Sequence, residues 1–502
     1  MNFTKTKKII AAGLSALMMM CSATPVFAAE SGDKSTTLNY QVSSSYDWII
    51  HSSIDFGADA GVGKTVDRAG NQVKVLKNVI PEGKYLNISV KGDGTDGAFA
   101  LTNGKTEKLS YDVTDDAGTV AVNGNVLSVP SGTNTAVQNM NFKLNTKKAT
   151  AEIAGQYNGR VVYNAEVGEK KEKSSSLITG YEFNNKIPSE ATSVAFTDEV
   201  APEGASTTDL TVAKDGGVVG WLDGTTWKVS TQDSSKVVNF NEVSGYMFFN
   251  KDDLTNIDFN NVDTSNVTNM AEMFYRTKLT SLDLSNFNTS KVTNMERMFG
   301  FFPNLTSLDL SNFDTSKVTN MAKMFGASNL TSLDLSNFDT SNVTNMAEMF
   351  YRTKLTSLDL SSFNTSKVTN MAKMFRSSKL TSLDLSSFNT SKVTNMEEMF
   401  YASDLTSLDL SSFNTSKVTN MAEMFGGSKL TSLDLSNFDT SKVTNMSGMF
   451  YGCRNLSSID LHNWYIASGT DVTCMFGWTN ITPDDVPYLD ISRVDKELMF
   501  SN

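Results

Sequence analysis

The sequence predicts an α+β multidomain protein: an N-terminal β-sandwich module, followed by a solenoid of repeats with one short strand and one short helix per repeat. Three features predict this fold class. The N-terminal third alternates apolar and polar residues between closely spaced turn residues. The second half repeats one segment with a period of 25 or 26 residues. Within each copy the apolar spacing changes from strand-like to helix-like.

The composition indicates a folded, acidic protein. The chain has 502 residues, which is enough for about three domains. Hydrophobic residues make up 39% and charged residues 20%, so the chain can bury a sizeable core. The net charge of −12 argues against nucleic acid as a partner. With only two histidines and three cysteines, the chain offers little for a zinc site or for Cys–His catalysis, and we expect neither a metal nor a cofactor.

Residues 1–29 are predicted to be a secretory signal peptide. Lysines precede an apolar run over residues 9–20, and small residues mark a cleavage site after Ala28 or Ala29. One alternative is a membrane anchor, which would need a longer apolar run. The other is a lipid-modified Cys21, but the methionines before it match a lipobox poorly.

The compartment follows from this segment and from the rest of the chain. After cleavage we expect no transmembrane segment, because no later stretch is long and apolar enough to span a membrane. The last residues carry no sorting motif with a hydrophobic tail, so covalent wall anchoring is not supported. We therefore expect a protein that is secreted, or held non-covalently at the cell surface.

Residues 36–168 are predicted to form the β-sandwich module. Alternation is clear over residues 85–90 and 160–165, and turn residues recur every 8–12 positions. The charged, serine-rich residues 169–176 are typical of a flexible linker. The role of this module is expected to be that of a spacer or an attachment module.

Residues 177–253 are predicted to be the N-terminal cap of the repeats. They contain two strand-like runs around the turn at Asp223 and Gly224. They end with Tyr246, Met247 and Phe248, which anticipate the repeated segment.

Residues 254–480 hold nine copies of the repeat. The copies begin at Leu254, Leu279, Leu305, Leu330, Leu355, Leu380, Leu405, Leu430 and Leu456. We number positions within each copy from this leucine, so Asp384 is position 5 of the copy that begins at Leu380. No copy can bury its apolar side chains alone, so neighbouring copies must stack around one core. Residues 481–502 echo part of a repeat and are predicted to be the C-terminal cap.

Each copy is predicted to contain a strand and then a helix. In a typical copy the first half follows a leucine-rich-repeat pattern, with Leu380, Leu383 and Leu385 at positions 1, 4 and 6. In its second half Val393, Met396, Met399 and Phe400 have the spacing of one face of a short helix. These halves together predict a leucine-rich-repeat-like solenoid.

The repeated block resembles the BspA-like leucine-rich-repeat surface proteins. The resemblance rests on Leu-Thr-Ser-Leu-Asp-Leu, on Val-Thr-Asn-Met and on Met-Phe, and it covers residues 254–476. It implies an exported bacterial surface protein that binds a host or bacterial surface protein or glycan, in the manner of an adhesin. It implies no reaction, so we expect no enzyme activity.

Position 5 is aspartate in all nine copies and provides the main candidate site. These side chains lie between inward-pointing leucines and should face outward beside serines. One alternative is a solvated acidic face, and the other is a face that binds cations or a basic ligand. Catalysis would need paired carboxylates in different environments, which a repeated flat face lacks. The candidate ligand-binding aspartates are Asp283, Asp309, Asp334, Asp359, Asp384, Asp409 and Asp434.

The variable loops and two cysteines each allow both a functional and a purely structural interpretation. The loops after the predicted helices vary, and Phe301 and Phe302 are candidate ligand contacts there, unless the loops simply differ between copies. Cys453 and Cys474 fall in consecutive copies and could form a disulfide, or remain two buried thiols.

Two other functions compete with ligand binding. Near-identical copies also suit a passive structural spacer of the cell surface. A surface hydrolase would need one copy with an asymmetric cluster of polar residues, and the sequence shows none.

Overall fold

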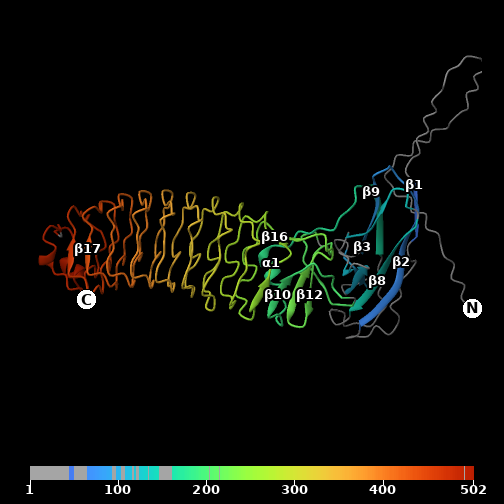
Figure 1. Cartoon of the computed structure of the whole chain (residues 1–502), viewed down its shortest axis with the longest axis horizontal. Helices are drawn as coiled ribbons and strands as arrows, with labels where there is room; N and C mark the ends of the chain where they lie inside the picture. Colours follow the sequence, from blue (N-terminus) through green and yellow to red (C-terminus); the bar gives the residue numbers. More distant parts are fainter. Residues whose placement is uncertain are drawn as a thin grey trace, which may run out of the picture. The chain divides into compact units, whose positions relative to one another are not determined.

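The computed structural model has two compact units (Figure 1). The first comprises Met1–Ser174 and Ala213–Gly217, and the second comprises Ser175–Val212 and Val218–Asn502. The predicted signal peptide lies outside the described residues. The structure describes residues 45–49, 65–92, 98–102, 108–115, 118–119, 124–133, 135–145, 161–202, 204–213, 215–490 and 492–501.

The first unit contains two antiparallel sheets. The larger sheet has, in order, β1 (Ser45–Ile49), β2 (Thr65–Val79), β8 (Ala136–Asn145), β5 (Lys108–Asp115) and β4 (Ala100–Thr102), with β6 (Gly118–Thr119) paired to β5. The smaller sheet has β7 (Gly124–Pro130), β3 (Tyr85–Gly92) and β9 (Val161–Gly168).

The two sheets share one core. Val73 and Val75 on β2 pack in the same cluster as Leu86, Ile88 and Val90 on β3. These residues alternate along their strands, and side chains two residues apart lie on the same face of a sheet. Alternation therefore places one face of each sheet in the core.

The second unit begins with a small sheet. The strand order is β11 (Thr208–Asp209), β12 (Val219–Asp223), β13 (Thr226–Ser230), β10 (Ser193–Phe196) and β15 (Asn256–Asp258). The hairpin predicted around Asp223 and Gly224 is confirmed as β12 and β13, with Gly224 at φ +61°. β15 already belongs to the first repeat and pairs in parallel with β10. A second parallel pair joins β14 (Val238–Asn239) and β16 (Val262–Asp263).

The repeats stack on this sheet as a series of similar copies (Figure 1). The asparagine at position 16 forms a parallel bridge with the same position of the next copy, from Asn269 through Asn445. One hydrophobic core runs from Leu177 to Met499 and contains the leucine, valine, methionine and phenylalanine columns. The remaining elements are β17 (Ser432–Asp434), β18 (Ser458–Asp460), the 3-10 helix η3 (Pro483–Asp485) and α2 (Lys496–Met499).

The predicted α+β solenoid, with a strand and a helix in each repeat, is wrong. Among the described residues the α-helices are α1 (Gly180–Asn184) and α2, which have five and four residues and lie outside the nine copies. Positions 19 and 23 of the copies have left-handed backbone angles, as at Glu398 (φ 51°) and Ala402 (φ 51°). An α-helix requires negative φ throughout, so two such residues in five exclude it.

Backbone hydrogen bonds show what replaces the helix. Met399 and Tyr401 donate to carbonyls three residues earlier, at 3.2 and 3.1 Å. The residues that follow each of them donate to the next copy instead: the Phe400 N–H lies 2.8 Å from the Met424 carbonyl, and the Ala402 N–H lies 2.7 Å from that of Gly426. This half of each copy is therefore a chain of tight turns that is paired to its neighbours.

The two short helices lie at the two ends of this ladder of turns. In α1 the Gly180 N–H donates to Val243 at 2.8 Å, in the turn segment that precedes the first copy. At the other end, Leu498 and Met499 of α2 accept from Cys474 and Phe476 at 2.9 and 3.0 Å. The first N–H groups and the last carbonyls of a helix have no partner within it, so these short helices use such groups to bond to the two ends of the ladder.

Candidate functional site

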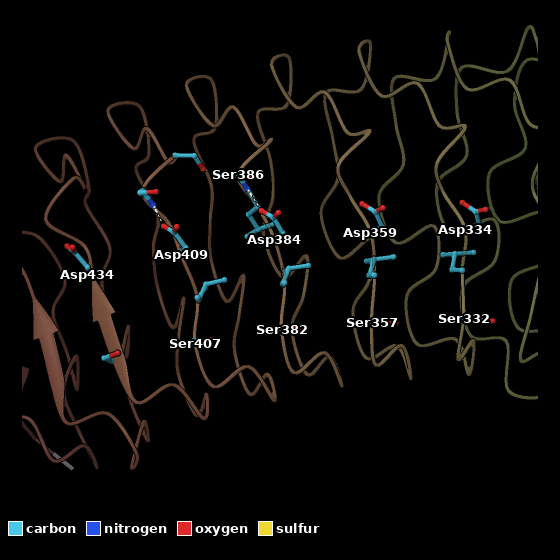
Figure 2. A pocket seen from close by; sticks show the side chains of 18 residues that line it. Ser332, Asp334, Ser357, Asp359, Ser382, Asp384, Ser386, Ser407, Asp409 and Asp434 are labelled. Carbon is cyan, nitrogen blue, oxygen red and sulfur yellow. Dashed lines mark hydrogen bonds between the residues drawn. The ribbon is translucent and has the colours of Figure 1, made fainter.

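A groove runs along the copies on the side of the Leu-Thr-Ser-Leu-Asp-Leu segments (Figure 2). Its volume is about 1170 Å³. Positions 3, 4 and 5 of the copies that begin at Leu330, Leu355, Leu380 and Leu405 line it, together with Ser432 and Asp434. Serine and aspartate supply the exposed polar groups, and the leucines at position 4 are only partly buried.

Along most of the groove, the segments that line it are not paired as strands. Among the described residues 330–410, no backbone hydrogen bond joins residues 332–335 to the equivalent residues 357–360. The same segments do pair in the last two copies, where β17 and β18 form a short parallel ladder. The turn half thus holds neighbouring copies together, while the groove half remains open.

The aspartates at position 5 lie where the sequence predicts, on the exposed face of the copies (Figure 2). Each also has a local role that the sequence analysis missed: its Oδ1 accepts the backbone N–H two residues later, as in the 2.9 Å bond from Ser386 to Asp384. Such a bond closes an Asx turn, which bends the chain after the leucine segment. The equivalent bonds occur at Asp283, Asp309, Asp334, Asp359, Asp409 and Asp434.

These hydrogen bonds keep the row of aspartates ionised. The backbone and side-chain hydrogen bonds from Ser386 lower the pKa of Asp384, against a smaller opposing effect of the neighbouring charges of Asp409 and Asp359. The pKa of each of the other six candidate aspartates is also lowered by the serine two residues later. At neutral pH the groove therefore presents a row of negative charges that can only accept hydrogen bonds.

Acidification is expected to destabilise the repeats. Because the folded pKa of Asp384 is lowered, its ionised form stabilises the fold at any pH above the unfolded value of about 3.9. That contribution is lost as the pH falls through the folded pKa. The urea midpoint of unfolding should therefore decrease from about pH 5 to about pH 3. A midpoint that rises over this range would contradict the assignment.

The two candidate phenylalanines differ in exposure, and neither lines the groove. Phe302 is completely buried, with its ring 6.3 Å from that of Phe299, so the prediction that it contacts a ligand is wrong. It is buried because it takes position 24, which faces the core. Phe301 is 47% exposed and packs edge-on against Tyr275, with ring centroids 5.4 Å apart.

The variation at position 22 follows a packing rule that the sequence analysis missed. The ring of Tyr401 lies over Gly426 of the next copy, where an added Cβ would be only 2.9 Å from the ring. Tyr275 and Gly300 form the same kind of pair. Three of the four tyrosines at this position are thus matched by glycine in the following copy, which a comparison of adjacent copies could have revealed. The exception is Tyr351, where the Arg376 guanidinium of the next copy lies 6.0 Å from the ring centroid.

Of the two alternatives for Cys453 and Cys474, the disulfide is not formed, and both cysteines are free. Cys453 occupies buried position 24, where its thiol lies 3.0 Å from the Phe425 carbonyl oxygen. Cys474 occupies position 19, where its Sγ lies 3.4 Å from Ser501 Oγ. Stacking brings equal positions together, so cysteines at different positions of consecutive copies do not meet.

Within the described ranges, no cluster of three or more histidine, cysteine, aspartate or glutamate side chains has the arrangement of a metal site. No described helix has the length and hydrophobicity needed to cross a membrane. The groove, with its repeated carboxylates and serines, is therefore the candidate site.

Comparison with known proteins relates the repeats to one family. The family model described as "Mycoplasma protein of unknown function, DUF285" matches residues 241–333, 300–409, 326–431 and 402–502. No curated protein and no solved structure matches. The matches support a repeat family but do not confirm the narrower resemblance to BspA-like proteins. Together they span just over half of the chain, which therefore belongs to the DUF285 family of repeat proteins.

Proposed function

We propose that this protein is exported and acts at the cell surface, where it binds a surface protein or glycan of a host or of other bacteria through the groove. The observation that carries the proposal is the groove itself, which extends over five consecutive copies and exposes their aspartates and serines. The predicted signal peptide supports the location, and the resemblance to BspA-like surface proteins supports the adhesin-like role.

The charge of the groove indicates which groups a ligand should carry. The ionised aspartates accept hydrogen bonds and repel one another, so a ligand that offers cationic groups or several hydroxyl donors complements them. Each exposed ion pair between an aspartate and a cationic group of the ligand contributes only about 0–1 kcal/mol to the binding free energy. Useful affinity therefore requires contacts with several copies at once, which a groove across five copies permits.

We propose binding rather than catalysis because the aspartates of the row share the same surroundings. Each accepts hydrogen bonds from the serine two residues later, and each has its pKa shifted in the same direction. A general acid and a general base need environments that move their pKa values apart.

A passive spacer is the second candidate, and one observation favours it. The Asx turns give the aspartates a structural role that requires no ligand. A spacer would use the stacked copies only to hold the N-terminal module away from the cell.

The test replaces Asp334, Asp359 and Asp384 with asparagine in the full mature protein. Asparagine keeps an oxygen that can accept the turn hydrogen bond, so the fold should survive while three charges are lost. Adhesion of cells and matrix proteins to the immobilised variant should weaken by roughly tenfold or more, and the salt dependence of adhesion should decrease.

The matched control changes three charges that do not line the groove, in the copies that begin at Leu355, Leu380 and Leu405. It replaces Lys367, Lys392 and Lys417 at position 13 with glutamine, and adhesion should stay within about twofold of the unmodified protein. Unchanged adhesion of the folded aspartate variant would reject the acidic groove as the binding surface and favour the spacer.

A further inference from the structure

Position 8 of the repeat differs between copies in a way that matters for the groove. It is serine in three consecutive copies and asparagine in the other six. The serines are Ser362, Ser387 and Ser412, and the asparagines are Asn261, Asn286, Asn312, Asn337, Asn437 and Asn463.

The asparagines next to the groove bind the preceding copy more firmly than the serines do. Asn337 Nδ2 donates to the carbonyls of Leu310 and Phe313, both at 3.0 Å. Asn437 makes the same two bonds to the copy before it, at 3.0 Å each. Ser387 makes a single bond of 3.2 Å, to the Leu360 carbonyl. A serine hydroxyl has one proton to donate, whereas an asparagine amide has two.

The three serine copies lie at the centre of the groove. Their hydroxyls connect the four copies that begin at Leu330, Leu355, Leu380 and Leu405, which are the copies that line most of the groove. Ser412 itself lines the groove. Asn337 and Asn437 make the firmer contacts just outside these three junctions.

We propose that these serines make the centre of the groove adjustable, while the asparagine-bonded copies on either side form a fixed frame. This inference deepens the proposed function, because it identifies where the groove can change its width to fit a ligand. Its relevance to binding rests on that proposed function.

The backbone contacts determine how the copies can move. In the central copies the turn half remains paired, with the Phe375 N–H 2.9 Å from the Met399 carbonyl and the Phe400 N–H 2.8 Å from that of Met424. In the described residues 357–385 the groove half has no backbone hydrogen bond between neighbouring copies. Copies that are joined by backbone bonds along one edge, and only through side chains along the other, can tilt about the backbone-paired edge, which changes the spacing on the groove side.

Hydrogen exchange of the ligand-free, full mature protein tests this inference. The reporters are amides at position 10, which donate to the position-11 threonine of the preceding copy: Asn389 to Thr365 at 2.8 Å in the centre, and Asp314 to Thr289 at 2.9 Å in the frame. The Asn389 amide should exchange roughly tenfold faster than that of Asp314. Peptides that extend into positions 18–23 distinguish the copy of Asn389 from the copy of Asp314 by mass, because these residues differ between the two.

Two sets of variants separate the role of position 8 from other causes. Replacing Ser362, Ser387 and Ser412 with asparagine should slow exchange at Asn389 to the rate at Asp314. The reverse change, Asn337→Ser, should extend fast exchange to the neighbouring junction. As a control, asparagine in place of Ser366, Ser391 and Ser416 at position 12 should leave the rates unchanged.

Equal exchange at the two reporters in the unmodified protein, or no response to the changes at position 8, would overturn the inference. Its failure is distinguishable from failure of the proposed function, because exchange is measured without a ligand. Unchanged adhesion of the aspartate variant, together with an exchange pattern that follows position 8, would contradict only the function. If binding holds, the triple asparagine variant should also adhere several-fold more weakly, because its groove can no longer adjust.

Discussion

Replacing Phe375 with alanine is expected to lower the free energy of unfolding of the repeats by about 3–5 kcal/mol. The Phe375 ring is completely buried, and it stacks between those of Phe350 and Phe400. Each neighbouring centroid is 5.8 Å away, with angles of 9° and 7° between the ring planes. Alanine would leave a cavity in the column, and the identical copies on both sides cannot fill it without moving their own rings.

Urea unfolding measures this loss, and Phe301→Ala is the matched control. Phe301 is 47% exposed at a nearby position of the stack, so its truncation should cost less than about 1 kcal/mol. Because stacked repeats interact mainly with their nearest neighbours, Phe375→Ala should also broaden or divide the transition. Similar losses for both variants would show that the phenylalanine column does not hold the copies together.

The apolar pattern of one copy predicts which residues are buried but not the backbone that buries them. Val393, Met396, Met399 and Phe400 lie in the core as expected. Their spacing fits a chain of successive turns as well as it fits a helix. Left-handed residues at positions 19 and 23 also bring these side chains back to the core side of the copy. Gly448 and Gly427 occupy these two positions in later copies and were a sequence signal for positive φ.

The candidate site was predictable in part. The exposure of the aspartate row follows from its place between leucines. The turn hydrogen bond of Asp384 and the cross-copy bonds of Asn337 were not predicted, because they depend on how side chains meet backbone groups. The choice between a disulfide and two free thiols at Cys453 and Cys474 stayed open for a related reason, since it depends on which positions of consecutive copies meet.

The second large effect is expected at Thr365, where valine should lower the free energy of unfolding by about 2–5 kcal/mol. Thr365 is completely buried at position 11, and its hydroxyl joins two copies. It donates to the Asn389 carbonyl at 3.0 Å and accepts the Asn389 N–H at 2.8 Å. Valine has the same shape but no hydroxyl, so both backbone groups of Asn389 would lose their partner.

The comparison with Thr369 shows why burial and geometry, rather than the residue type, decide the size of this effect. Thr369 lies in the same copy but is exposed, and its hydroxyl donates to the Thr344 carbonyl at 3.2 Å. Its own backbone N–H already donates to that carbonyl at 2.9 Å. Thr369→Val should therefore cost less than about 1 kcal/mol. Thr365→Ser, which keeps the hydroxyl, should restore most of the stability lost in Thr365→Val. Urea midpoints that are equal for valine at the two positions would mean that the buried threonines do not join the copies, and that apolar stacking alone sets their spacing.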